Sequence, residues 1–371
     1  MGLVLSFCFG GRAGGREIAY KPLSLSRLSI HMRFFCSAPP KTDSCQSFRD
    51  KKEVADAAKF LFDGLSDEQL AKAPGEINGQ QHAHCPPCIE GCRIYLADWS
   101  ASVNVDDCTD CTILIGPCKG SVFIRDCTAC RLLIIAQQFR TRDCSNLDVH
   151  LYCQTQPIIE ESKSLRFAPA QLAYNQLPEQ MKAASLSPFN NRWSDFHDFT
   201  PDEDPHFRLL NIVDAPLDPF QVPEELTSLS ALDINLDSDA SFIPLTLGKL
   251  PLPKGSPKSY FAMFSCEGGA EELHRRCLLF VNLLRSEYQV ALGESKELSM
   301  NATDAERIFA TARFNDCVSK GPVIEGWLVG EGGATAVVEL AKSRDWTRLI
   351  HVPDTAQHSH FITYAEMQQT V

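Results

Sequence analysis

The sequence predicts a mostly β-strand domain, folded as a parallel β-helix, followed by a smaller α+β domain of the ferredoxin-like type. The first observation is a phrase that occurs three times, as Asp-Asp-Cys-Thr-Asp-Cys (106–111), Arg-Asp-Cys-Thr-Ala-Cys (125–130) and Arg-Asp-Cys-Ser-Asn-Leu (142–147). Its copies begin nineteen and then seventeen residues apart. Short β-branched and aliphatic runs lie between them, so each copy is typical of one coil that must stack on its neighbours.

Stacked coils place equivalent residues in columns. The three columns that this register predicts are Cys111, Cys130 and Leu147; Ile113, Leu132 and Val149; and Ile115, Ile134 and Leu151. All nine side chains are apolar or small. We therefore expect these columns to point into the β-helix and the neighbouring polar columns to point outward.

The second observation is the order of patterns after residue 257, where strand-like and helix-like segments alternate. The expected strands are 260–265, 288–292, 323–329 and 348–352, and the expected helices are 270–285, one from Thr303, and 334–342. This order predicts a ferredoxin-like sandwich over residues 258–371. Residues 201–257 contain nine prolines and begin with many acidic residues, which favours a linker between this domain and a β-helix domain at 46–200.

Composition limits the possible functions. The chain has 371 residues, enough for two domains, and its net charge of -12 argues against general nucleic-acid binding, which needs a basic face. Many of the sixteen cysteines fall at inward β-helix positions, and the sequence shows no secretory signal. We therefore expect reduced intracellular thiols. No apolar run reaches eighteen residues, so no membrane-spanning helix is expected.

Residues 1–45 form an expected flexible leader with six basic residues against two acidic ones. Its first six residues fit the myristoylation pattern at Gly2, and Cys8 is a candidate for a second acyl chain. Two such signals are needed for stable membrane anchoring. The alternatives are a chance match in a disordered leader, a transit peptide, or translation from Met32.

Four cysteines have the spacing of a zinc site: Cys108, Cys111, Cys127 and Cys130. Leu147 replaces the second cysteine in the third copy, and Ile89 stands one repeat before Cys108. Positions that exchange Cys for Leu and Ile require a compact apolar side chain, so we expect no metal there. The segment 82–88 has four possible ligands, His82, His84, Cys85 and Cys88, but Pro86 and Pro87 interrupt it and favour a loop of unassigned role.

Arg140 ends the most apolar strand of the repeat, directly after Gln137-Gln138-Phe139. Glu160 comes twenty residues later, about one coil, so we expect it to lie beside Arg140 at the strand spacing of about 5 Å and to hold its guanidinium by a forked pair. Gln137 and Gln138 would flank it. A fixed outward arginine suits delivery of a cation into a partner's active site, whereas the plainer alternative is a solvated surface arginine.

Several segments resemble the tubulin-cofactor-C family: 116–123, 137–144, 155–160, 189–193 and 197–201. The resemblance is strong over about residues 55–205. It extends weakly into the C-terminal domain through Lys320-Gly321-Pro322-Val323-Ile324, which looks like part of a nucleoside-diphosphate-kinase-like fold. It therefore implies a right-handed β-helix followed by a kinase-like α+β domain.

The resemblance implies a GTPase-activating protein for an Arf-like small GTPase in its GTP state. Arg140 would be the arginine finger, Glu160 the residue that orients it, and the partner-binding residues would be Gln137, Gln138, Phe189, Asn190 and Trp193. The partner would hold GTP and Mg²⁺, and this chain would need no cofactor of its own. The C-terminal domain lacks the His-Gly-Ser-Asp segment of active kinases, so no enzymatic activity is expected there.

The same resemblance implies acylation at the N-terminus and a role in ciliary trafficking of lipidated cargo. It also implies that the protein lies at the cytoplasmic face of the plasma membrane and at the ciliary base, with a part of it in the cytoplasm. The family places Gly and Cys next to each other, whereas Cys8 stands six residues after Gly2 here. Three alternatives remain: a tubulin-folding cofactor acting on tubulin-bound GTP, a non-catalytic scaffold, and a nucleotide kinase in the C-terminal domain.

Overall fold

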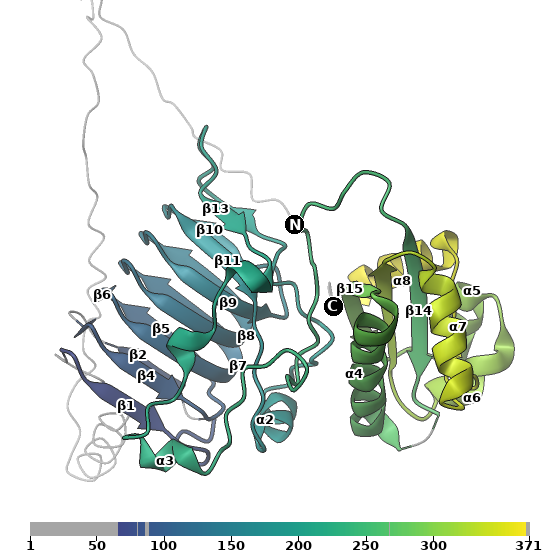
Figure 1. Cartoon of the computed structure of the whole chain (residues 1–371), viewed down its shortest axis with the longest axis horizontal. Coiled ribbons are helices and arrows are strands. Elements are labelled where there is room, and N and C mark those ends of the chain that lie inside the picture. The colour runs from purple at the N-terminus through teal and green to yellow at the C-terminus, as the bar shows by residue number, and fades with distance from the viewer. Residues whose placement is uncertain (1–65, 80, 86–88, 267, 369–371) are drawn as a thin grey trace, which may run out of the picture. The chain divides into compact units, whose positions relative to one another are not determined.

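The computed structural model describes residues 66–79, 81–85, 89–266 and 268–368 (Figure 1). The expected leader, with Gly2 and Cys8, lies outside the described residues, as does Cys88. Within the described part of the chain, no helix combines the length and apolar composition needed to cross a membrane.

Residues 69–209 form the predicted parallel β-helix, seen in Figure 1 as a stack of parallel arrows. Its main sheet runs in the order β1-β4-β7-β8-β9-β11-β13, and β2, β5, β10 and β12 pair alongside this path. The strands are β1 Gln69–Lys72, β2 Gln81–Cys85, β3 Ile89–Glu90, β4 Arg93–Leu96, β5 Ser102–Asp106, β6 Cys108–Thr109, β7 Thr112–Arg125, β8 Arg131–Arg142, β9 Asp148–Cys153, β10 Ile158–Glu160, β11 Leu165–Pro169, β12 His197–Asp198 and β13 Phe207–Leu209.

The pairing register confirms the predicted columns. Ile113 of β7 pairs with Leu132 of β8, which pairs with Val149 of β9. Ile115, Ile134 and Leu151 form the next inward column in the same way, and all of these side chains are buried. Because the side-chain period of a strand is two, this register sends every second residue into the core and the others outward.

The repeated phrase forms a corner of each coil. Two residues in each copy have left-handed backbone angles, with φ between 46° and 58°, in the columns Asp107, Asp126, Asp143 and Glu161, and Asp110, Ala129, Asn146 and Ser164. Asp and Asn adopt this conformation more readily than most residues. The residue after each of them is buried, and it is a cysteine at five places and Leu147, Ser162 or Leu165 at the other three.

The prediction that these cysteines are compact core residues is therefore confirmed. No cluster of three or more His, Cys, Asp or Glu side chains in the described ranges has the arrangement of a metal site. The expectation that all thiols are reduced is wrong at one place, because Cys266 and Cys317 form a disulfide in the C-terminal domain. The backbone of residues 81–85 is strand β2, paired with β5, rather than a loop.

The prediction that residues 201–257 are an extended linker is also wrong. Residues 207–243, here called the strap, add β13 to the sheet and then cross an outer face of the β-helix, with Phe220, Leu229 and Ile243 buried. The strap contains the short helices η2 Ile212–Asp214, η3 Asp218–Phe220 and α3 Thr227–Ser230, and α2 Leu177–Ala183 packs in the same cluster. This face carries outward apolar side chains, so it requires a cover.

Residues 258–368 form the predicted ferredoxin-like domain. The antiparallel sheet has the order β15-β16-β14-β17, with β14 Lys258–Phe264, β15 Ala291–Leu298, β16 Val323–Val329 and β17 Ile350–His351. The helices are α4 Gly269–Tyr288, α5 Ala302–Phe309, η4 Ala312–Phe314, α6 Asn315–Val318, α7 Gly333–Ser343 and α8 Thr355–Gln368. Two hydrophobic cores result, one with α4 and α7 and one with α5, α6 and α8.

Helix α8 is absent from the sequence prediction. Its buried side chains are only Phe361, Tyr364 and Ala365, which gives too weak a periodic pattern to indicate a helix.

Candidate partner-binding surface around Arg140

Strand β8 carries Arg140 on the outside of the β-helix. The strands β7 and β8 are long, and their pairing shifts register between Ile115 and Ser121, so each strand contributes to two sides of a coil. On the second side the alternation is regular: Phe139 and Thr141 are buried, while Arg140 is exposed. The sheet therefore presents Arg140 outward on a hydrogen-bonded strand.

Arg140 belongs to an outward row of residues from four neighbouring strands. Phe123, Arg140, Ile158 and His197, here called the Arg140 row, are paired in register across β7, β8, β10 and β12. The guanidinium carbon of Arg140 lies 5.7 Å from the centroid of the Phe123 ring. A cation–π contact of this kind stabilises by about 0.5–1 kcal/mol at an exposed position, so it favours one orientation of the arginine without burying its charge.

Glu160 does not lie beside Arg140 as predicted. It is in the adjacent coil, but it pairs with Arg142, and Ile158 is the residue opposite Arg140. The pairing joins residues eighteen apart here, whereas the prediction assumed twenty. Among the described residues Arg140 has no ion pair. The number of residues between Arg140 and Glu160 does not by itself show that the coil spacing here is eighteen rather than twenty.

The charges next to this row are largely paired with each other. The guanidinium of Arg125 donates two hydrogen bonds to the carboxylate of Asp106, at 2.6 and 2.8 Å, and this contact raises the pKa of Arg125. Arg142 donates to the carboxylate of Asp143 at 3.2 Å. Arg140 therefore stands out as the cation of this face without a carboxylate partner in the described part of the chain.

Gln137 and Gln138 lie at the bend of β8 and are half-buried. The side-chain oxygen of Gln138 accepts a hydrogen bond of 2.7 Å from the hydroxyl of Ser121. The main-chain oxygen of Gln137 accepts one of 2.9 Å from the hydroxyl of Thr155. Gln137 and Gln138 therefore lie close to Arg140 on the same strand, as the sequence predicts.

Phe189 and Trp193 are buried, so the prediction that they bind a partner is wrong, whereas Asn190 is half-buried and its predicted role stays a prediction. Phe189 and Trp193 are fully buried, and the indole N–H of Trp193 donates to the hydroxyl of Thr246 at 3.0 Å. The side chain of Asn190 bonds to the main chain of Glu297, accepting at 2.7 Å and donating at 3.1 Å. Aromatic and amide residues of this kind are typical of interfaces, but here β15 of the same chain contacts Phe189 and Asn190, and Thr246 bonds to Trp193.

Phe199, which the sequence did not indicate as a surface residue, is 59% exposed. Its main-chain N–H donates to the carbonyl of Ile159 at 2.9 Å, which attaches it to β10, and its ring makes an edge contact with His197. A large exposed aromatic side chain on the same side of the coil as an outward arginine is typical of a binding surface. No strand period around residue 199 indicated its exposure, so the sequence offered no signal beyond its place in the segment 197–201.

Among the described residues, this surface therefore combines an exposed arginine without a carboxylate partner, the half-buried side chains of Phe123 and Ile158, and the exposed ring of Phe199. The family profile described as tubulin binding cofactor C matches residues 87–199, the part of the chain that carries this surface. The fold and the surface therefore define a protein with a tubulin binding cofactor C domain.

Similar proteins extend this assignment to most of the chain. Protein XRP2 of Gallus gallus is 39% identical over 288 residues, which are 76% of this chain and 78% of that protein. Protein XRP2 of Homo sapiens is 38% identical over 293 residues, 78% of this chain and 81% of that protein. Tubulin-folding cofactor C of Arabidopsis thaliana is 31% identical over 150 residues, 40% of this chain and 35% of that protein. The chain belongs to the XRP2 family.

Proposed function

We propose that the chain is a GTPase-activating protein for an Arf-like small GTPase and supplies Arg140 in trans as an arginine finger. The observation that carries the proposal is the position of Arg140: exposed, on a hydrogen-bonded strand, and without a carboxylate partner among the described residues. The exposed ring of Phe199, attached to the same sheet, supports docking of a protein surface here.

In this mechanism the partner holds GTP and Mg²⁺, and Arg140 enters its site. The guanidinium stabilises negative charge that develops on the transferring γ-phosphoryl group, which accelerates hydrolysis about 10³- to 10⁵-fold in known cases. The rigid strand lowers the entropic cost of placing the cation. The contact with Phe123 is weak enough to be exchanged for contacts to phosphate.

Glu160 is part of the proposal with an altered role. Glu160 lies on the same outward face as Arg140 but opposite Arg142. To be oriented by Glu160, the guanidinium of Arg140 must leave the Phe123 ring when the partner docks. A carboxylate that forms its forked pair only in the complex would still fix the arginine for the transition state.

The test is single-turnover GTP hydrolysis by an Arf-like GTPase in the presence of the full chain. We expect acceleration by the wild type, at least a hundredfold loss of it in Arg140→Ala, and a similar loss in Arg140→Lys because an ammonium cannot form a fork. Glu160→Gln should retain binding and lose part of the acceleration.

Arg344→Ala is the matched control, since Arg344 is an exposed arginine of the C-terminal domain. Its acceleration should equal that of the wild type. No acceleration by a folded wild-type chain, or full acceleration by Arg140→Ala, would refute the proposed finger.

A second candidate is the activation of GTP hydrolysis by tubulin, which is favoured by the names of relatives that match over a smaller part of this chain: tubulin-folding cofactor C and tubulin-specific chaperone C. The same arginine would act, so the assay is repeated with GTP-bound tubulin. Acceleration with tubulin and none with an Arf-like GTPase selects this candidate. If neither responds while Arg140→Ala melts at a lower temperature, the arginine is structural and the chain is a scaffold.

We further propose that acylation at Gly2 and Cys8 anchors the chain to the cytoplasmic face of the plasma membrane, including the ciliary base, where it acts on transport of lipidated cargo. Gly2→Ala should move the protein from the membrane fraction to the soluble fraction, because one remaining chain binds only marginally. Cell fractionation measures this. An unchanged distribution would contradict anchoring through Gly2.

A further inference from the structure

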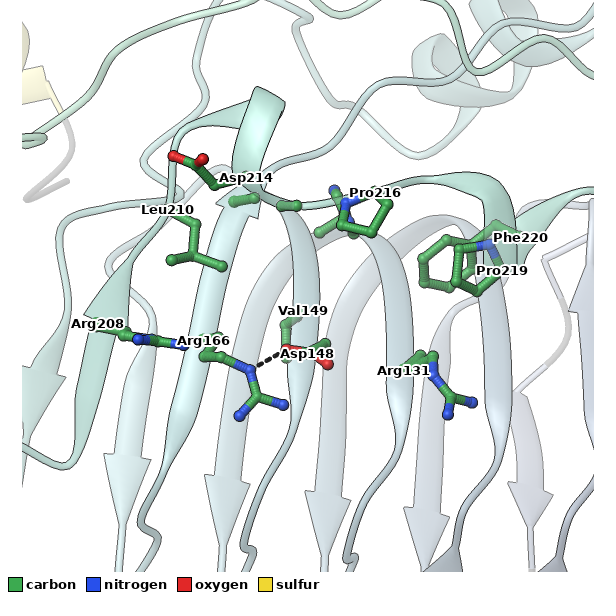
Figure 2. A pocket seen from close by; sticks show the side chains of 13 residues that line it. Arg131, Asp148, Val149, Arg166, Arg208, Leu210, Asp214, Pro216, Pro219 and Phe220 are labelled. Atoms are coloured by element: carbon green, nitrogen blue, oxygen red, sulfur yellow. Dashed lines mark hydrogen bonds and ion pairs between the residues drawn. The ribbon is translucent and has the colours of Figure 1, made fainter.

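A cavity of about 510 Å³ lies where the strap leaves the outer face of the β-helix (Figure 2). Its floor includes His150 of β9 and Ala168 of β11, and its wall is formed by the strap residues Pro216, Pro219 and Phe220. The volume is within the usual range of small-molecule sites, about 300–1,000 Å³. Nothing in the Arg140 surface uses these residues.

The rim of this cavity is a row of charged residues from successive strands, here called the arginine row. Arg131, Asp148, Arg166 and Arg208 are paired in register across β8, β9, β11 and β13. Figure 2 shows Arg166 and Arg208 on neighbouring strands below the strap, with Asp148 between Arg166 and Arg131. Neighbouring strands are about 4.8 Å apart, so the Arg166 and Arg208 side chains start close enough to hold one anionic group together.

The three arginines differ in how they are occupied. Arg166 donates to the carboxylate of Asp148 and, at 2.9 Å, to the side-chain oxygen of Asn146. Arg131 makes a looser contact of 3.4 Å with Asp110. Among the described residues no carboxylate pairs with Arg208, which is exposed. Asp148 and Asp214 are the carboxylates of the lining, and Asp110 outside it pairs with Arg131, so Arg208 is the guanidinium of the row left without a carboxylate among the described residues.

His150 contributes an unsatisfied polar atom to the floor. Only 3% of the residue is exposed, its ring makes an edge contact with Phe220 at 5.6 Å between centroids, and its Nδ1 has no hydrogen-bond partner. Leaving a buried polar atom unpaired costs about 1–3 kcal/mol. The main-chain oxygens of Pro169 and Pro216 lie near the ring and offset part of the effect of burial on its pKa, so a ligand could complete the contacts of this nitrogen. Burial lowers the pKa of His150 to about 4, which keeps the ring neutral near pH 7 and able to donate or accept one bond at that nitrogen.

We propose that this cavity binds a small organic anion, with its phosphate or carboxylate group at Arg166 and Arg208 and its apolar or aromatic body between Ala168 and Phe220. The arginine row supplies charge-assisted hydrogen bonds, and the strap supplies the apolar contact. Inorganic phosphate alone would use only the rim.

The cavity and the Arg140 surface lie on different sides of the same coil. Arg131 and Arg140 are both in β8, but they are on opposite sides of the bend at residues 136–138. The small anion can therefore bind without occupying the surface proposed for the GTPase. This site does not depend on the proposed function being correct.

Titration of the full chain with phenyl phosphate, phenylacetate and inorganic phosphate, followed by calorimetry and saturation-transfer NMR, tests the site. We expect an aromatic anion to bind at least tenfold more tightly than inorganic phosphate. Comparison of the first two probes identifies the preferred anionic group. Failure of both aromatic probes to bind, or binding no tighter than that of inorganic phosphate, overturns the proposal.

Arg208→Gln removes the unpaired cation of the rim, and Arg344→Gln removes an equivalent exposed charge in the C-terminal domain. Losing a charge-assisted hydrogen bond should weaken binding about tenfold or more in Arg208→Gln and leave Arg344→Gln unchanged. Because Arg208 is exposed, its replacement should not affect folding, and thermal melting checks this. Equal affinities in the two variants would place the anion elsewhere and refute the site.

Discussion

His150 is the buried residue whose protonation should affect stability most clearly. Its pKa falls from 6.5 to about 4 on folding, chiefly because burial disfavours the charged ring. Above about pH 6.5 the ring is neutral in both states and has no effect. As the pH falls toward 4, the unfolded chain takes up a proton that the folded chain resists, so the folded state loses stability.

We predict that this residue alone lowers the free energy of unfolding by about 2 kcal/mol between about pH 7 and pH 5. Urea unfolding at the two pH values measures the change. His150→Phe keeps an aromatic contact with Phe220 and cannot titrate, so it should show a smaller loss. If both proteins lose the same stability, His150 is not neutral in the folded chain.

The outward position of Arg140 could be predicted from the sequence around it. The strand run before it placed it on the outside of a coil, and the structure agrees. Its partner could not be chosen in this way, because paired residues on this side of successive coils are nineteen, seventeen and then eighteen positions apart, whereas Glu160 stands twenty after Arg140. A shift of two residues keeps Glu160 on the same face but moves it opposite Arg142.

At the scale of the structural element, the corners of the β-helix explain the repeated phrase. Each corner needs two residues with left-handed backbone angles around one inward cysteine or its equivalent, and Asp or Asn usually fills these places. Ala129 is an exception, with φ of 58°. Its Cβ makes this conformation costly, by about 1–2 kcal/mol.

Ala129→Gly should therefore stabilise the chain by about 0.5–1 kcal/mol, since relief of the backbone strain exceeds the added entropy of the unfolded glycine. The same replacement at Ala183, an exposed residue with helical geometry at the end of α2, should destabilise it. Urea unfolding of both variants compares the signs. Destabilisation by Ala129→Gly would show that the corner is unstrained.

At the scale of the whole molecule, the β-helix depends on the strap. Outward apolar residues of its sheet, including Tyr95, Leu133 and Tyr152, are buried in one cluster with Phe220 and Ile243 of the strap. Each large apolar side chain removed from water contributes about 1.5–3 kcal/mol. A β-helix cut before the strap would expose this face.

We predict that a fragment of residues 46–205 melts at a lower temperature than a fragment of residues 46–257 and binds a dye for apolar surfaces, such as anilinonaphthalene sulfonate. The longer fragment also keeps the bond between Trp193 and Thr246. Thermal melting and dye fluorescence measure the difference. Equal melting temperatures without dye binding would mean that the strap is dispensable.

The sequence by itself determined the coil repeat, its inward columns, the ferredoxin-like order of the second domain and the outward position of Arg140. These features depend on local periods of two residues within a strand and about nineteen between coils, which are visible along the chain. Only the tertiary structure decided the partner of each outward residue, the burial of Phe189 and Trp193, and the cavity under the strap. These features depend on which distant segments cover which face of the β-helix. In the strap, the many prolines and acidic residues favour a linker in a sequence-based prediction, although its apolar side chains pack on the sheet.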